Sequence, residues 1–174
     1  GSSLFIRSIA GGGVGAGKRD ALLDEIEAIT SEAPQTEAIV VETSGSSPAL
    51  ALRDALAEDA GLAGRVYVDT VIAVVDTSTF VEYWRDERLK PLLSDQIGGA
   101  DLVVLNKFDR AGFYRRRKTR RIVAKTNPAA RVGSAEFGRL PTNEVIATGR
   151  RGEIDDGSAT RPTNPDFRPI VARF

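Results

Sequence analysis

The sequence contains no cysteine, no methionine and no histidine. Without thiolates or imidazoles, the chain cannot build a soft transition-metal site from its own side chains. We therefore expect no transition-metal site within it. The absence of cysteine also excludes a disulfide framework, so cysteine usage gives no information on the redox compartment.

Long apolar runs and an excess of one charge are missing as well. No apolar segment approaches the ~20 residues of a membrane-spanning helix, and the N-terminal stretch, interrupted by Arg7, lacks the pattern of a signal peptide. Basic and acidic residues both number 24, so no net charge draws the chain to nucleic acid or to a membrane. We expect a cytoplasmic protein with neither of these partners. The leading Gly1-Ser2-Ser3 in place of a methionine suggests a tag remnant or a fragment.

What is present suits a globular domain: the chain has 174 residues, of which 41% are hydrophobic and 28% charged. Three apolar runs rich in β-branched residues, at 38–41, 71–75 and 102–105, alternate with helical patterns. Such runs are typical of buried parallel strands joined by right-handed crossovers. The sequence thus predicts an α/β fold with a mostly parallel sheet and flanking helices. We expect this domain to cover 1–150 and a flexible tail or linker to cover 151–174, with weak strand pairing at 167–171.

The strand expected at 102–105 runs directly into Asn106-Lys107-Phe108-Asp109. Open α/β sheets bind ligands at the carboxyl ends of their strands, which is where these polar residues fall. A fixed carboxylate at Asp109 can accept two N–H bonds from guanine, whereas adenine would leave it partly unpaired. Lys107 would lie along the base with its apolar stem. The motif therefore indicates GTP recognition, and the simpler alternative is a strand followed by an Asn/Asp turn.

An acidic residue, Glu42, ends the strand expected at 38–41 and precedes a turn of small residues that includes Gly45. Such an acidic residue is typical of a site that holds Mg²⁺, often through water. Glu42 is thus the candidate catalytic and Mg²⁺-binding residue, and Gly45 is a candidate N–H donor to a terminal phosphate. The alternative is a turn that only joins a strand to a helix.

A glycine-rich loop follows the first expected strand, at 4–10, and precedes a helix. Residues 12–18 fit the phosphate-loop pattern G-x-x-x-x-G-K. Backbone N–H groups at positions such as Gly15 and Gly17 would surround the phosphates, and Lys18 would reach the terminal ones. The alternative is a glycine-rich connector that binds no ligand.

Two further helices are predicted, one over about 48–59 and one over about 79–93 with a break at Pro91. A basic run then extends from Arg110 to Arg121. It is open to two interpretations, a nucleic-acid patch or a solvated helix face. The zero net charge and the few aromatic residues favour the solvated face.

Taken in order, these motifs resemble the CobW family of GTP-dependent metallochaperones or metal-insertion GTPases. The family is related to the nickel-insertion GTPases of urease and hydrogenase maturation. The segments that carry the resemblance are 41–48, 71–76, 96–97, 100–101, 105–109 and 127–130. The resemblance implies a P-loop-NTPase-like fold, GTP and Mg²⁺ as ligands, and a metalloprotein client. It places Glu42 at the Mg²⁺ position and Asn106, Lys107 and Asp109 at the guanine.

The N-terminal part departs from the family, in which a phosphate loop precedes a long segment with Cys-x-Cys-Cys and then a helix containing Arg-Asp. In one alignment, 12–18 is the phosphate loop of a chain with a large deletion. In the other, 13–16 stands in place of Cys-x-Cys-Cys, and Arg19-Asp20 matches the helix after it. We favour the second, because the residue after a phosphate-loop lysine should be Ser or Thr and arginine cannot ligate Mg²⁺.

The second alignment implies that the chain is incomplete at its N-terminus and that the true phosphate loop lies outside it. GTP hydrolysis is then expected to be weak. The alternative is a non-catalytic remnant or interaction module that keeps the fold without effective nucleotide binding.

Overall fold

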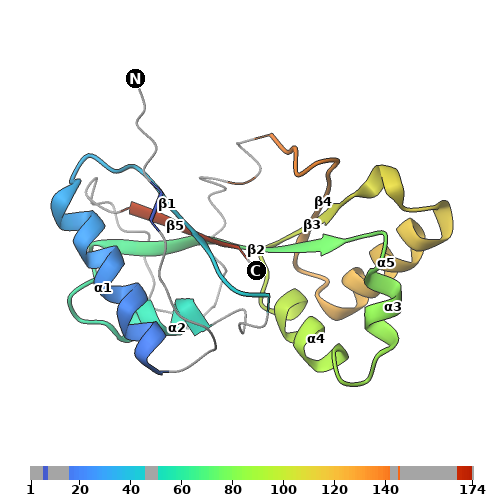
Figure 1. The fold of residues 1–174 in the computed structure, drawn as a ribbon, viewed down its shortest axis with the longest axis horizontal. Helices are drawn as coiled ribbons and strands as arrows, with labels where there is room; N and C mark the ends of the chain where they lie inside the picture. The colour runs from blue at the N-terminus through green and yellow to red at the C-terminus, as the bar shows by residue number, and fades with distance from the viewer. Residues whose placement is uncertain (1–5, 8–15, 46–50, 142–144, 146–167, 174) are drawn as a thin grey trace.

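A computed structural model describes residues 6–7, 16–45, 51–141, 145 and 168–173. Within these residues one parallel sheet has the strand order β1-β5-β2-β3-β4 (Figure 1). The strands are β1 (Ile39–Glu42), β2 (Val66–Asp76), β3 (Leu102–Asn106), β4 (Arg131–Ser134) and β5 (Arg168–Arg173). Because all of them run in one direction, their carboxyl ends share one edge of the sheet, as the sequence predicts.

The described helices gather in two groups (Figure 1). One group is α1 (Ala16–Glu32) and α2 (Ala51–Glu58), and the other is α3 (Phe80–Arg85), α4 (Lys90–Gly98) and α5 (Phe113–Thr126). Both groups cover the same face of the sheet, as the register shows. Val41, Ala172 and Val71 stand side by side in register, and in-register neighbours point to the same face. Val41 packs under α1 and α2, and Ala73, two residues after Val71, packs under α3, α4 and α5.

The strand β3 is buried on both of its faces. Val103 and Leu105 are 0% exposed and pack with residues of α3, α4 and α5. Leu102 and Val104 point the other way and pack against the segment that follows β4, including Ala135. A continuous apolar run is what such a strand requires, and the prediction of a buried parallel strand here is confirmed.

The strand β1 is covered on one face only by the described residues. Ile39 and Val41 are buried in the cluster with α1 and α2, whereas Val40 between them is 61% exposed. The sequence predicts a fully buried strand here, and the structure shows an edge strand with one open face. An apolar run of four residues does not distinguish the two cases, because nothing local indicates whether a second layer covers the strand.

Three other segments differ from their predicted structure. The segment 168–173, expected within a tail, forms β5 between β1 and β2. Ile6 and Arg7, the described residues of the strand expected at 4–10, belong to no strand. The helical stretch predicted over 79–93 is two helices, α3 and α4. Its break falls before Pro91, which occupies the first turn of α4, where its missing N–H is harmless.

Two contacts among the described residues connect each group of helices to a loop of the other half of the sheet. Arg53 of α2 forms an ion pair of 2.9 Å with Asp101, and the same carboxylate accepts the backbone N–H of Val71 at 2.7 Å. Gln96 of α4 donates to the carbonyl oxygen of Gly45 at 2.8 Å. The loop after β1 is thereby held beside the helix that precedes β3.

Candidate functional site

The candidate site begins where β3 ends, at Asn106. Its backbone oxygen accepts the N–H of Thr77, which follows β2, at 3.0 Å, and its side-chain Oδ1 accepts the N–H of Gly138 at 2.9 Å. Lys107 then adopts a left-handed conformation with φ of 53°, and a 3-10 turn, η1 (Phe108–Arg110), follows. The chain therefore leaves the sheet through a sharp corner that is bonded to segments on both sides.

Lys107 is tied to the end of the neighbouring strand. Its Nζ lies 2.7 Å from Oδ2 of Asp76, and Oδ1 of Asp76 accepts the N–H of Ser78 at 2.9 Å and its hydroxyl at 2.5 Å. Partial burial pushes the pKa of Asp76 upward, but the bonds from Lys107 and Ser78 outweigh it and hold that pKa below its ordinary value. Asp76 is thus an ionised brace that fixes the lysine of the motif.

Asp109 lies on the solvent-exposed side of the same corner. Within the described part of the chain, its carboxylate has no hydrogen bond or ion pair. The turn that carries it is closed by backbone bonds from Arg110 N to Lys107 O at 3.1 Å and from Ala111 N to Phe108 O at 3.3 Å. The carboxylate is therefore presented on a bonded turn with its acceptor sites open to a ligand.

A cavity of about 400 Å³ adjoins this corner. Its walls are Phe108, Ser134, Ala135, Glu136, Phe137 and Arg139. Backbone bonds hold its floor to β3: Ala135 N donates to Leu105 O at 2.9 Å, and Phe108 N donates to Ala135 O at 3.2 Å. Phe108 is the residue of the Asn-Lys-x-Asp motif that lines this cavity, and Asp109 is not in its wall.

Glu42 and Gly45 lie at the end of β1, and both are exposed. Glu42 has no polar partner among the described residues, and a Cβ added at Gly45 would meet nothing within 4 Å. In the sheet register, Glu42 is level with Ile72 and Leu102, and Leu102 lies four positions before Asn106 on β3. The strands β5 and β2 separate β1 from β3. From strand spacing and rise, the offsets are about 14 Å across the sheet and about 13 Å along it.

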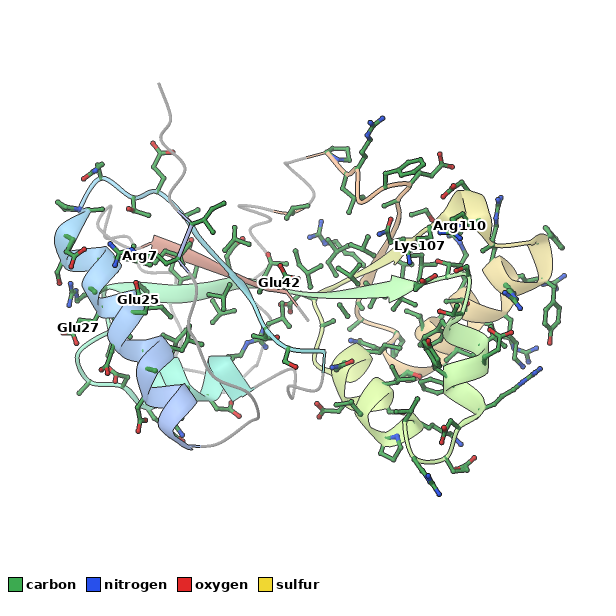
Figure 2. All side chains as sticks on the ribbon, viewed as in Figure 1. Arg7, Glu25, Glu27, Glu42, Lys107 and Arg110 are labelled. Atoms are coloured by element: carbon green, nitrogen blue, oxygen red, sulfur yellow. The ribbon has the colours of Figure 1, made fainter. Side chains whose placement is uncertain are left out.

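The two ends of the candidate site therefore share the carboxyl edge without touching each other. Figure 2 shows Glu42 near the middle of the molecule and Lys107 beyond β2, beside Arg110. The strands β5 and β2 lie between the two ends of the candidate site.

The glycine-rich loop is only partly described. Gly15 lies outside the described residues, and Gly17 and Lys18 lie in the first turn of α1, where only the backbone is described. The helix itself packs on the face of β1 that α2 also covers. Within the described ranges, no group of three or more potential metal ligands lies close together, and no helix is long and apolar enough to cross a membrane.

Several residues of this corner were not predicted as site residues. Asp76 and Gly138 brace Lys107 and Asn106, and residues 134–137 line the cavity. The signal for Asp76 was its place at a strand tip beside β3. Gly138 has φ of 71°, which glycine adopts readily. A glycine at this position indicates a sharp turn, but it does not indicate the hydrogen bond to Asn106.

Comparison with known proteins identifies a family for this chain. The model of the CobW/HypB/UreG nucleotide-binding domain matches residues 2–133. The chain belongs to this family. Zinc-regulated GTPase metalloprotein activator 1 from Dictyostelium discoideum is 26% identical over 152 residues, which cover 75% of this chain and 32% of the relative. The chain thus spans about a third of that relative's length, and no solved structure matches it.

Membership of the CobW/HypB/UreG family confirms the predicted family and fold class. The matched range contains β1, β2, β3 and the Asn-Lys-x-Asp corner.

Proposed function

We propose that this chain is the guanine-nucleotide-binding part of a CobW-type metal-insertion GTPase and that Asp109 reads the base. The observation that carries the proposal is the corner after β3. Asn106 and Lys107 are held by Gly138 and Asp76, whereas Asp109 has no partner in the described structure. A bonded turn that presents an open carboxylate loses little conformational freedom when a ligand binds.

The chemistry of the carboxylate favours guanine over adenine. An ionised Asp109 only accepts hydrogen bonds, and the guanine edge offers two neighbouring N–H donors at N1 and N2. Adenine offers an acceptor at N1, so its pairing with a carboxylate would leave one polar group unsatisfied. The methylene groups of Lys107 add an apolar surface beside the base, while its ammonium group remains paired with Asp76.

Glu42 and Gly45 are the proposed phosphate and Mg²⁺ end of the same site. A carboxylate at a strand end suits a hydrated Mg²⁺, which keeps most of its waters. Gly45 lies in the open, with its carbonyl oxygen held by Gln96, so its N–H can approach a phosphate without a side chain in the way. The distance from Glu42 to Asn106 along the sheet edge suits a ligand with a base at one end and phosphates at the other.

The position of α1 supports the alignment in which 12–18 is not the phosphate loop. The crossover from β1 through α2 to β2 runs in one direction across the sheet. Crossovers between parallel strands are right-handed in about 98% of cases, so a crossover in the opposite direction puts its helix on the opposite face. A helix that led from a central strand outward to β1 would therefore lie on the face of the sheet opposite to α2.

Contrary to that arrangement, α1 packs beside α2. Leu23 and Ile26 of α1 belong to the same buried cluster as Ala55 and Leu56 of α2. This packing does not fit a helix that leads outward from a central strand, and it therefore supports the second alignment. We therefore propose that Gly15, Gly17 and Lys18 contribute little to phosphate binding and that hydrolysis by this chain alone is weak.

The client is proposed from the relative's name and not from this structure. That relative is a zinc-regulated activator of metalloproteins, and a CobW-type domain would switch between two states according to its nucleotide. Phosphoryl transfer depends on positioned phosphates and Mg²⁺. A domain that holds the phosphates weakly would therefore still bind the nucleotide through its base but hydrolyse it slowly.

Calorimetric titration tests this function. With Mg²⁺ present, GTP and GDP are expected to bind in the micromolar range, and ATP is expected to give no saturable heat. Lys18→Ala is expected to leave binding and the slow hydrolysis unchanged, with Arg88→Ala as a control at an exposed arginine of the α3–α4 loop. Fast GTP turnover that disappears in Lys18→Ala would show that 12–18 is a working phosphate loop.

A non-catalytic module is the second candidate, and two observations favour it. Asp109 does not line the adjoining cavity, and the ammonium of Lys107 already has a carboxylate partner. In that case neither GTP nor GDP would give heat of binding. The same titration therefore separates the two candidates.

A further inference from the structure

The helix α5 carries a surface that the nucleotide site does not use. It is strongly basic: the segment from Arg110 to Lys125 contains no acidic residue. Five of its cations are exposed and have no hydrogen bond or ion pair to other described residues; they are Arg110, Arg117, Lys118, Arg121 and Lys125. Since the whole chain has a net charge of zero, this is a local concentration of charge and not a general property.

Aromatic side chains lie exposed beside these cations. Phe113 and Tyr114, in the first turn of α5, are 79% and 64% exposed. Phe113 lines a cavity of about 360 Å³ together with Phe108, Arg116, Arg117 and Arg120. The four residues from α5 have helical spacing and share one face of the helix. The result is a pocket with an aromatic wall and a rim of guanidinium groups.

The pocket is preformed by contacts within the chain. The guanidinium carbons of Arg116 and Arg120 lie 4.6 Å and 5.3 Å from the centre of the Phe108 ring. Arg116 also donates to the carbonyl oxygen of Ala111 at 2.6 Å, and Arg120 donates to the hydroxyl of Ser134 at 2.7 Å. These two arginines are fixed, so the pocket between them and Phe113 exists before any partner arrives.

We propose that this surface docks an acidic protein segment that inserts one apolar side chain between Phe113 and Phe108. We name it the α5 docking surface and define it by Phe113, Arg117 and Arg121 around the pocket. Aromatic and arginine side chains around a pocket are the usual composition of an interface centre, where an anchor residue gives most of the affinity. Carboxylates that flank the anchor would meet Arg117 and Arg121, whose N–H groups can donate to them.

Charge complementarity identifies the partner's chemistry, and the rest of the molecule argues against a nucleic acid. Arg116 and Arg120 are held by Phe108 and by uncharged oxygens, so they are not available to follow a phosphate backbone. The described part of α1 carries an opposite charge, with acidic residues at Asp20, Asp24, Glu25 and Glu27. Nucleic-acid binding depends on a broad positive field, and the basic segment 110–125 covers only α5 and the turn before it, in a chain whose net charge is zero.

Fluorescence anisotropy tests the proposal with the whole chain and a defined probe. The probe is a short fluorescein-labelled polyglutamate peptide with a central Leu-Phe pair. We expect saturable binding that weakens as the salt concentration rises, because exposed charge pairs are screened. The same peptide with Ala-Ala in place of Leu-Phe is expected to bind more weakly. No nucleotide is needed, so this result is independent of the proposed function.

Two variants and a matched control define the surface. Arg117→Glu/Arg121→Glu is expected to weaken binding of the peptide by about tenfold, and Phe113→Ala by about fivefold. The control Arg85→Glu/Arg88→Glu reverses the same number of exposed charges next to α3 and is expected to change little.

Three results would overturn the proposal. The first is no saturable binding of the peptide, and the second is an equal loss in the control variant. The third is tighter binding of a labelled single-stranded DNA than of the peptide, which would assign the surface to a nucleic acid.

Discussion

The two ends of the sheet are built differently, although they share one edge. At the β3 end, Val103 and Leu105 are fully buried, and the loop after the strand is bonded to Thr77 and Gly138. At the β1 end, Val40 is 61% exposed, and Glu42 has no polar partner among the described residues. One end of the candidate site is thus rigid in the free protein, and the other is open.

The difference extends to the contacts that hold the helices. Near β3, bonds from the Asn127 amide and from backbone groups stand beside an exposed ion pair between Arg115 of α5 and Glu82 of α3. Along α1, exposed ion pairs join Arg7 to Glu25 at 2.8 Å (Figure 2) and Arg19 to Glu58 at 2.5 Å, beside a part-buried bond from Arg65 to Thr30. Exposed ion pairs contribute little to stability because water and salt screen them. The comparison teaches that the residues proposed to recognise the base are held by contacts within the chain, whereas Glu42, proposed for the phosphate end, has no polar side-chain partner among the described residues.

The largest effect is expected from the core at the β3 end. Leu105→Ala removes a side chain with 0% exposure and should lower the free energy of unfolding by about 3 kcal/mol. Val40→Ala, at the open face of β1, should change it by less than about 0.5 kcal/mol. Urea unfolding of both variants measures the difference, and similar losses in the two would remove the contrast between the ends.

Asn127 is the next strongest tie at the β3 end. Its Nδ2 contacts three carbonyl oxygens at the end of α4, including that of Ile97 at 2.8 Å, and its Oδ1 accepts the N–H of Ala130 at 3.0 Å. Asn127→Ala should lower the free energy of unfolding by about 2 kcal/mol. Asn127→Asp keeps the acceptor oxygen and loses the N–H donors, so its loss of stability measures the contacts to the end of α4. An unchanged midpoint in both variants would contradict the assigned role.

A smaller, pH-dependent effect is expected from the brace at Lys107. The pKa of Asp76 is lowered in the folded state, so its stabilisation is present above its ordinary pKa and is lost as the pH falls through the lowered value. Asp76→Asn should therefore lower the free energy of unfolding at neutral pH by less than about 1 kcal/mol, because the pair is partly exposed. Urea unfolding across the acidic range should show this difference shrinking, and a constant difference would argue against the pair.

The smallest effect is expected at α1. Arg7 pairs with Glu25 and with Glu32 at 2.7 Å, and all three side chains are substantially exposed. Arg7→Ala should lie within about 0.5 kcal/mol of wild type in thermal or urea unfolding. Arg88→Ala gives the baseline for the loss of an exposed arginine. A loss well above this baseline would mean that the β1 end is more firmly held than its contacts suggest.

The sequence predicted the β3 end well for a physical reason. A strand buried on both faces must be apolar throughout, so the apolar run at 102–105 was enough to predict a buried strand. The polar residues after it marked the end of that strand. What could not be read was the brace. Asp76 lies on another strand and Gly138 on a later turn, and only the fold brings them to Lys107 and Asn106.

The β1 end was harder to predict because its structure depends on distant segments. The strand β5 pairs with β1 and β2 although its sequence contains Pro169, which cannot donate to the ladder and normally excludes a central strand. The glycine pattern at 12–18 indicated a phosphate loop, and Arg19 in place of Ser or Thr argued against it. The packing of α1 beside α2 adds a separate argument against it. Local patterns do not contain that information, because the handedness of a crossover is a property of the whole sheet.

The most direct test of base recognition by Asp109 is a change of specificity and not a loss of binding. Asp109→Asn replaces an acceptor with a donor, and xanthine carries an acceptor oxygen where guanine carries its amino group. Calorimetric titration of wild type and Asp109→Asn with GDP and xanthosine diphosphate is expected to show wild type binding GDP and the variant preferring xanthosine diphosphate. Equal GDP affinity in the two proteins would contradict the assignment of the base to this corner.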